Sequence, residues 1–203
     1  MKWLFAALFC AFLSAGDLPR VRYSKSFPGS VPAYVAITID QSGAGEYKEA
    51  PDDENPLKFQ IKDADVKELF DLIEKLDHFR HPLESPLKVA FMGMKTFRFE
   101  NGAEKTEVKF NFSEDLAARD LADCFEKVSE SEQHRINLER AAKYDKLGVM
   151  KALLQFESSW DRKRIVGAEQ FLPILDRIAK NETYLHEARL RAAKMADAIR
   201  AAK

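Results

Sequence analysis

Two histidines spaced three residues apart are the side chains whose chemistry is easiest to name from this sequence. His78 and His81 follow Glu74 by four and seven residues, so one continuous helix would place all three on the same face. Imidazole and carboxylate groups are the usual nitrogen and oxygen ligands of zinc. Pro82 follows at once and predicts the end of the helix, where the helix dipole favours histidine without any metal. Both interpretations stay open, and nothing else in the sequence requires a cofactor.

A second candidate is the carboxylate of Glu157, which two serines follow in residues 153–160. This segment is similar to the part of lytic transglycosylases that carries the catalytic acid, a glutamate followed by serine at a helix end. The resemblance implies a general acid with a raised pKa that protonates a glycosidic oxygen. The loop expected next in those enzymes is absent, because residues 169–173 read EQFLP. An amphipathic helix with its apolar residues buried accounts for the same segment.

Phenylalanines are concentrated between residues 91 and 112. They are Phe91, Phe97, Phe99, Phe110 and Phe112. Phenylalanine strongly favours burial, so a hydrophobic core is the preferred interpretation of this group. More rings than one sheet face can bury would leave an exposed apolar patch, and such patches mark partner surfaces. Phe91, Phe97 and Phe99 are the residues that we assign to such a surface under this alternative.

Cys124 lies among Leu121, Phe125 and Val128 at helical spacing, which predicts a buried thiol rather than a reactive one or an intermolecular bridge. His134 stands among charged residues, and residues 162–164 read RKR, so we expect both segments to be solvated. The nucleophile elbow, the His-Glu-x-x-His zinc motif and the phosphate-binding glycine loop are all absent. The sequence therefore indicates a protein that is not an enzyme.

The N-terminal segment has the layout of a secretory signal peptide. Lys2 precedes an apolar run over residues 3–13, and small residues follow up to Gly16, after which we expect cleavage. The run is too short to cross a bilayer, and no later run approaches the roughly 18 apolar residues of a membrane span. The formal net charge of −1 gives no bulk attraction to nucleic acid. These features predict a periplasmic or secreted protein without a nucleic-acid partner.

Hydropathy patterns divide the rest of the chain into three parts. Residues 17–32 have no periodicity and are expected to form an extended lead-in. Residues 33–128 are expected to form an α+β domain with the order βββαββ, a mainly antiparallel sheet of about five strands covered by one helix. Residues 129–203 are expected to form a helical region, and three or four helices follow Ser113, with interruptions near Gly148, Gly167 and Asn181.

The stretch from Tyr34 to Val128 resembles a family of bacterial exported domains of unknown function. The resemblance lies in the order of YVAITIDQSGAGEY, FQIKDADVKELFDLIEKLDHF and a phenylalanine-rich hairpin. It implies export and a small strand meander crossed by one helix, and it carries no site residues.

Taken together, these patterns predict a non-enzymatic exported protein that binds or scaffolds an envelope or extracellular protein partner. A cell-wall hydrolase that uses Glu157 is one alternative. A metal-binding exported protein that uses His78 and His81 is another.

Overall fold

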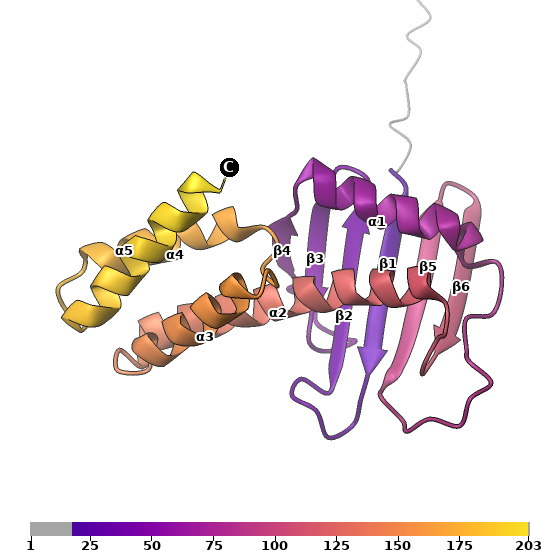
Figure 1. Ribbon diagram of the computed structural model, residues 1–203, viewed down its shortest axis with the longest axis horizontal. Helices are drawn as coiled ribbons and strands as arrows, with labels where there is room; N and C mark the ends of the chain where they lie inside the picture. Colours follow the sequence, from indigo (N-terminus) through magenta and orange to yellow (C-terminus); the bar gives the residue numbers. More distant parts are fainter. Residues whose placement is uncertain (1–17, 203) are drawn as a thin grey trace, which may run out of the picture.

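The computed structural model describes residues 18–202 and contains one six-stranded antiparallel sheet (Figure 1). The strand order across the sheet is β4-β3-β2-β1-β5-β6. The strands are β1 (Arg20–Ser26), β2 (Tyr34–Asp40), β3 (Ala44–Lys48), β4 (Leu57–Gln60), β5 (Met94–Asn101) and β6 (Glu104–Phe110). Helices follow the strands and also pack against them, which confirms the α+β class and the antiparallel sheet that the sequence predicts.

The central strand β1 differs from the expected order of elements, because it lies within the predicted lead-in. Val21 and Tyr23 are fully buried and point to one face, but they are the only two apolar residues that alternate in β1. Arginines at positions 20 and 22 occupy the other face, so the apolar pattern is too short to identify. Pairing with β2 on one edge and β5 on the other therefore fixes this strand, and the order is ββββαββ.

The remaining strands follow the alternation in the sequence. Val35, Ile37 and Ile39 of β2 are buried. The turn between β5 and β6 consists of Gly102 and Ala103, because Asn101 is still paired with Glu104 in the sheet. Gly102 has a φ of 58°, a conformation that glycine adopts without steric cost.

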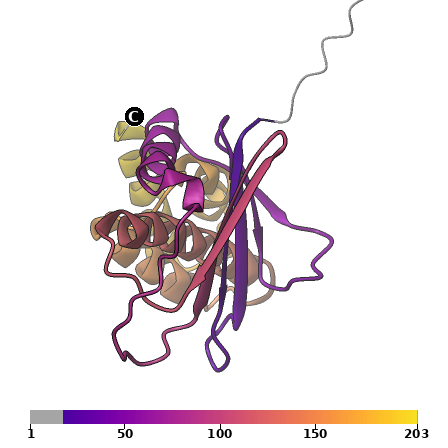
Figure 2. The ribbon, with the colours of Figure 1, turned by 90° about the vertical axis from the view of Figure 1, so that its right-hand side faces the viewer.

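Two helices lie on one face of the sheet (Figure 2). Helix α1 (Asp63–Lys75) buries an apolar stripe that includes Leu69 and Ile73, as its three- and four-residue spacing predicts. Helix α2 (Leu116–Tyr144) begins where the Asp115 carboxylate accepts a hydrogen bond from the Ala118 backbone N–H. A short 3₁₀ turn, η1 (Asp77–Phe79), follows α1.

Aromatic rings fill the space between the sheet and these helices. The Tyr23 ring stacks on Phe125 of α2 with a centroid distance of 4.9 Å. The Phe97 ring lies 5.2 Å from Phe79 and 5.1 Å from Phe110, measured between centroids. Because these rings come from β1, β5, β6, η1 and α2, one core holds the sheet and its covering layer together.

A second core lies among the C-terminal helices. They are α3 (Val149–Asp161), the 3₁₀ turn η2 (Ala168–Phe171), α4 (Leu172–Lys180) and α5 (His186–Ala201). Gly148 precedes α3, Gly167 precedes η2 and Asn181 follows α4, so the predicted interruptions are confirmed. Phe156 and Phe171 stack at 4.3 Å in this core, and small residues of α5 pack closely around them.

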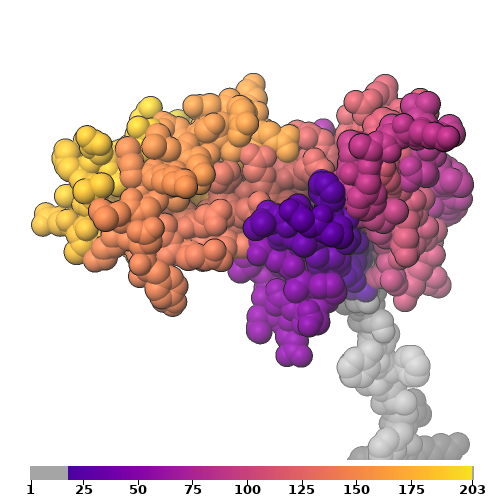
Figure 3. All heavy atoms as spheres, turned by 90° about the horizontal axis from the view of Figure 1, so that it is seen from below, coloured from indigo at the N-terminus to yellow at the C-terminus, as the bar shows by residue number. Residues whose placement is uncertain are grey.

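Helix α2 belongs to both cores, because its residues up to Val128 pack on the sheet and Leu138 and Ala142 pack with α3 to α5. The helix continues without a break through the expected boundary at residue 128. We call the strands, α1 and the first half of α2 the sheet lobe, and the remaining helices the helical lobe (Figure 3). No helix among residues 18–202 is long and apolar enough to span a membrane.

Candidate functional site

A cavity of about 590 Å³ lies where the sheet lobe meets the helical lobe, and we call it the junction pocket. Its walls come from α1, the first half of α2, the end of α3, the loop that follows α3 and the end of α5. The lining is mainly apolar, and it includes Glu68, Leu69, Cys124, Val128, Trp160 and Val166. Ligand sites are typically apolar cavities of about 300–1,000 Å³ with a few polar groups, so this cavity is the candidate functional site.

The loop of residues 162–167 forms one wall of the pocket and packs closely against the sheet lobe. Gly167 has a φ of 61°, and a Cβ at this position would lie 2.8 Å from the Gln60 carbonyl oxygen. Only glycine therefore allows the loop to approach β4 this closely.

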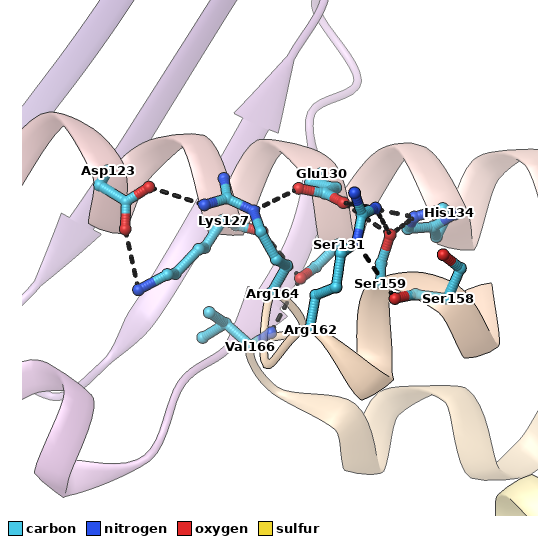
Figure 4. A network of polar contacts seen from close by, with 10 residues as sticks. All are labelled: Asp123, Lys127, Glu130, Ser131, His134, Ser158, Ser159, Arg162, Arg164 and Val166. Atoms are coloured by element: carbon cyan, nitrogen blue, oxygen red, sulfur yellow. Dashed lines mark hydrogen bonds and ion pairs between the residues drawn. The ribbon is translucent and has the colours of Figure 1, made fainter. Parts of the chain in front are cut away.

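Arg164 fixes this loop to α2 (Figure 4). Its guanidinium donates to Glu130 Oε2 and to Asp123 Oδ1, both at 2.7 Å, and its side chain is 27% exposed. The Ser131 hydroxyl accepts a hydrogen bond of 2.9 Å from the Val166 N–H. We call Arg164, its two carboxylate partners and the Ser131–Val166 contact the loop latch. Arg162 and Lys163 are exposed, as expected of a solvated basic turn, but the expectation is wrong for Arg164, which is held between two carboxylates.

The latch determines the charge state of its carboxylates. Burial raises the pKa of Asp123, but hydrogen bonds from Lys127 and Arg164 outweigh burial and lower it below its usual value. The pKa of Glu130 is also lowered, because hydrogen bonds from Ser159 and Arg164 outweigh the effect of burial. Both carboxylates are therefore ionised at neutral pH, and the latch is a set of charge-assisted hydrogen bonds.

A second buried charge ties α2 to β4 and to the helical lobe. Glu132 is 1% exposed and lies 2.6 Å from the Arg135 guanidinium, which also donates to the Lys58 carbonyl oxygen at 3.1 Å. The Gln170 amide donates to Glu132 Oε1 at 2.8 Å. Burial raises the pKa of Glu132 although Arg135 opposes this shift. The two lobes therefore meet through polar contacts on both sides of the loop wall.

Ser159, His134 and Glu130 lie together and invite comparison with a nucleophilic triad (Figure 4). Ser159 Oγ lies 2.6 Å from Glu130 Oε1, to which it donates, and 2.9 Å from His134 Nε2. A hydroxyl has one proton, so the histidine must donate to the serine and is not placed to accept its proton. Ser159 is 2% exposed, and Glu130, His134 and Arg162 already occupy its hydroxyl oxygen.

We conclude that Ser159 is a structural hydrogen-bond centre between α2 and α3. Burial lowers the pKa of His134, which supports a neutral imidazole at this position. The imidazole is only 15% exposed, which corrects the expectation that His134 is solvated.

The predicted metal ligands do not come together. His78 lies in η1 with a φ of 50°, and its ring stacks on Phe99 at a centroid distance of 4.5 Å. Its Nδ1 lies 3.6 Å from Glu104, while His81 and Glu74 are exposed on separate elements. Among residues 18–202, no group of three or more His, Cys, Asp or Glu side chains has the arrangement of a metal site. Because α1 ends at Lys75, the three residues Glu74, His78 and His81 do not share one face of a continuous helix, which the proposed metal site requires.

Glu157 holds α3 to α5. Its carboxylate accepts hydrogen bonds from Arg191 and from Lys194, the latter at 3.3 Å, and it is 15% exposed. Two cations stabilise an ionised carboxylate, whereas a general acid must hold a proton. The contacts of Glu157 therefore suit helix packing, and Glu157 does not line the junction pocket.

The phenylalanines assigned to a partner surface separate into two groups. Phe97 and Phe99 point inward from β5 and are 0% and 3% exposed, so they belong to the core and not to a surface. Phe91 precedes β5 and is 53% exposed. Its ring contacts the ring of Phe27, which lies in the loop that follows β1, with a centroid distance of 5.9 Å.

Cys124 is half-buried in the wall of the junction pocket, and it is the only free cysteine in the described part of the chain. Burial raises its pKa to about 11, so the thiol is protonated at neutral pH and is not an activated nucleophile. The predicted cleavage position Gly16 lies outside the described residues.

Sequence reasoning missed Arg164, Ser159 and Trp160 as site residues. The latch partners of Arg164 lie 34 and 41 positions away along the chain. A local motif cannot indicate a pairing over such a distance. The only local feature that marks this segment is the apolar pair Ile165-Val166, which lies between the basic residues and Gly167. A scan against protein-family models and a search of curated proteins both find no match for this chain. The resemblance over residues 34–128 therefore stays a prediction.

Proposed function

We propose that this protein is a non-enzymatic binding module of the periplasm or the extracellular space, and that it holds a small, partly apolar molecule in the junction pocket. The observation that carries this proposal is the cavity itself, which has the volume and the apolar lining of a ligand site. The N-terminal layout of Lys2, an apolar run and Gly16 supports export. Export predicts that protein isolated from its own host begins with Asp17.

The fixed position of the loop wall supports binding over catalysis. The loop latch holds residues 162–167 against α2 before any ligand arrives, so little ordering is needed on binding. Ser159, the hydroxyl that lies beside His134 and Glu130, is buried and already donates its proton to Glu130. The one thiol of the wall has a raised pKa, which suits a packing role.

Neutral 4-phenylbutanol is a suitable first probe of the pocket. We expect it to shift the indole N–H signal of Trp160 in proton–nitrogen NMR spectra, with the signal assigned from a Trp160→Phe variant. Cys124→Phe adds a ring to the wall from the first half of α2 and is expected to abolish the shift. Arg140→Phe is the matched control, because Arg140 is exposed on the same helix and does not line the pocket.

Binding that survives Cys124→Phe, or that Arg140→Phe removes equally, would place the probe elsewhere and refute the proposed site. Thermal unfolding of each variant shows whether the fold is retained, so loss of binding is interpreted only for folded protein. Ala202→Trp fills the pocket from a second side, because Ala202 directly follows α5 and is an exposed part of the lining.

A protein-binding surface is the second candidate function, and a separate observation favours it. Five large apolar side chains within eight residues are 39% to 54% exposed: Leu87, Val89, Phe91, Met92 and Met94. A concentration of exposed apolar residues on one segment is typical of an interaction surface. A protein captured from native envelope by the wild type should be lost with Phe91→Ser and kept with Tyr144→Ser, which alters an exposed ring elsewhere.

A further inference from the structure

The charged groups that line the junction pocket are unequally paired. Lys62 Nζ lies 3.0 Å from Glu169 Oε1, and Lys127 Nζ lies 2.9 Å from Asp123 Oδ2. Two of the three lysines in the lining therefore already face a carboxylate of the protein. The positive charge of each lysine is already neutralised by its partner carboxylate, so an anionic ligand would have to compete with Glu169 or Asp123 for it.

Three carboxylates of the lining form no ion pair and no side-chain hydrogen bond within residues 18–202: Asp65, Glu68 and Asp161. Asp65 lies in the first turn of α1, where the helix dipole stabilises a negative charge. Glu68 lies near Cys124, because its charge adds to burial in raising the pKa of that thiol. The third lysine, Lys163, also has no such pair in the described chain, so the unpaired charge of the lining is negative overall.

Trp160 adds an aromatic wall to this lining. An indole attracts a cation within about 6 Å of its ring centre, and the attraction is stronger where water is excluded. Leu69, Val128 and Val166 provide apolar surface deeper in the same cavity. The pocket thus combines an apolar interior, an aromatic ring and unpaired carboxylates.

We infer that the junction pocket takes an organic cation, a molecule with an apolar body and a protonated amine or quaternary ammonium group at one end. The inference rests on the proposed function and names its ligand class. The cationic end lies near Glu68 and Asp161 with Trp160 beside it, and the apolar body covers Leu69 and Val128. The carboxylates do not converge as metal ligands within the described residues, so a diffuse organic cation suits them better than a metal ion.

A series of ligands with one body and three different ends tests this inference. The probes are 4-phenylbutylamine, 4-phenylbutanol and 4-phenylbutyrate, titrated into the full chain at neutral pH by calorimetry and by NMR. We expect the amine to bind roughly five- to tenfold more tightly than the alcohol, and the carboxylate to bind most weakly. High salt should reduce the preference for the amine without affecting the alcohol.

Glu68→Gln is the decisive variant, and it should weaken amine binding at least twofold while alcohol binding is unchanged, because Asp161 and Trp160 still face the cation. Glu74→Gln is its control, because Glu74 is exposed on the same helix and outside the lining. Equal or tighter binding of the carboxylate probe, or an equal loss of amine and alcohol in Glu68→Gln, would overturn the charge preference and leave the proposed site intact. Failure of all three probes to bind would overturn both.

Discussion

Replacing Arg164 with glutamine tests whether the loop latch holds the two lobes together. The side chain makes two charge-assisted hydrogen bonds of 2.7 Å to α2, and the shorter, neutral glutamine keeps neither ion pair. Asp123 and Glu130 then lie close together without a shared cation. Arg162→Gln is the matched control, because Arg162 lies two residues away, is 64% exposed and approaches Glu130 only to 3.6 Å.

The expected cost follows from the burial of the groups involved. Hydrogen bonds to charged groups contribute about 1.5–3 kcal/mol each when buried, and exposed pairs contribute about 0–1 kcal/mol. Arg164 and Glu130 are 27% and 26% exposed and Asp123 is 43% exposed, which lies between these limits. We therefore expect Arg164→Gln to lower the free energy of unfolding by about 2 kcal/mol in total. Arg162→Gln should cost no more than about 0.5 kcal/mol.

Urea unfolding at pH 7 measures both values, and thermal unfolding should show a fall in Tm of about 4–8 °C for Arg164→Gln. A double-mutant cycle with Glu130→Gln should show that the two losses overlap, since one contact is shared. Equal effects of Arg164→Gln and Arg162→Gln, or fully additive losses in the cycle, would refute the latch.

Three further predictions follow from the core, the thiol and the latch. Phe97→Ala should destabilise the protein by about 3–5 kcal/mol in urea unfolding and Phe91→Ala by less than about 1 kcal/mol, because only Phe97 is buried; similar costs would contradict this assignment. In a Cys10→Ser background, Cys124 should react with a disulfide reagent at pH 8 about tenfold more slowly than a thiol of pKa 9.0, because its pKa is about 11 and the smaller thiolate fraction outweighs the greater nucleophilicity of that thiolate; a rate typical of an ordinary thiol would contradict its burial. The free energy of unfolding should fall as the pH drops, because the pKa values of Asp123 and Glu130 are lower in the folded protein than their usual values of 3.8 and 4.5. The stabilisation from these two carboxylates is fully present above their usual pKa values, and it is lost as the pH falls through their lowered pKa values. Glu130→Gln should make stability less dependent on pH in this range. Glu132 acts in the opposite direction, because its pKa is raised. An unchanged dependence of stability on pH in Glu130→Gln would exclude the latch as the source of the fall.

Periodicity in the sequence is sufficient to predict most of the fold. Strand β2 alternates with Val35, Ile37 and Ile39 on one face, and the stripe of α1 recurs at helical spacing, so each pattern reports its own burial. Strand β1 was missed, because only Val21 and Tyr23 carry the pattern and both neighbouring strands come later in the chain. Local patterns cannot report pairing that depends on two distant partners.

The candidate site depends on contacts that no local pattern contains. Glu68, Cys124 and Trp160 are separated by 56 and 36 residues, and only the packing of α1, α2 and the end of α3 brings them to one cavity. The segments that drew attention in the sequence have structural roles instead. Glu157 joins two helices, and His78 stacks on a core ring after the helix has ended.

The most direct test of the central claim is a map of backbone amide shifts as 4-phenylbutylamine is added to the full chain. We predict that the amide shifts are confined to the segments that surround the junction pocket. These are residues 65–69 of α1, the first half of α2, residues 160–169 and the end of α5. Shifts confined to the segment 87–94, or spread evenly over the strands, would contradict the claim that this cavity is the binding site.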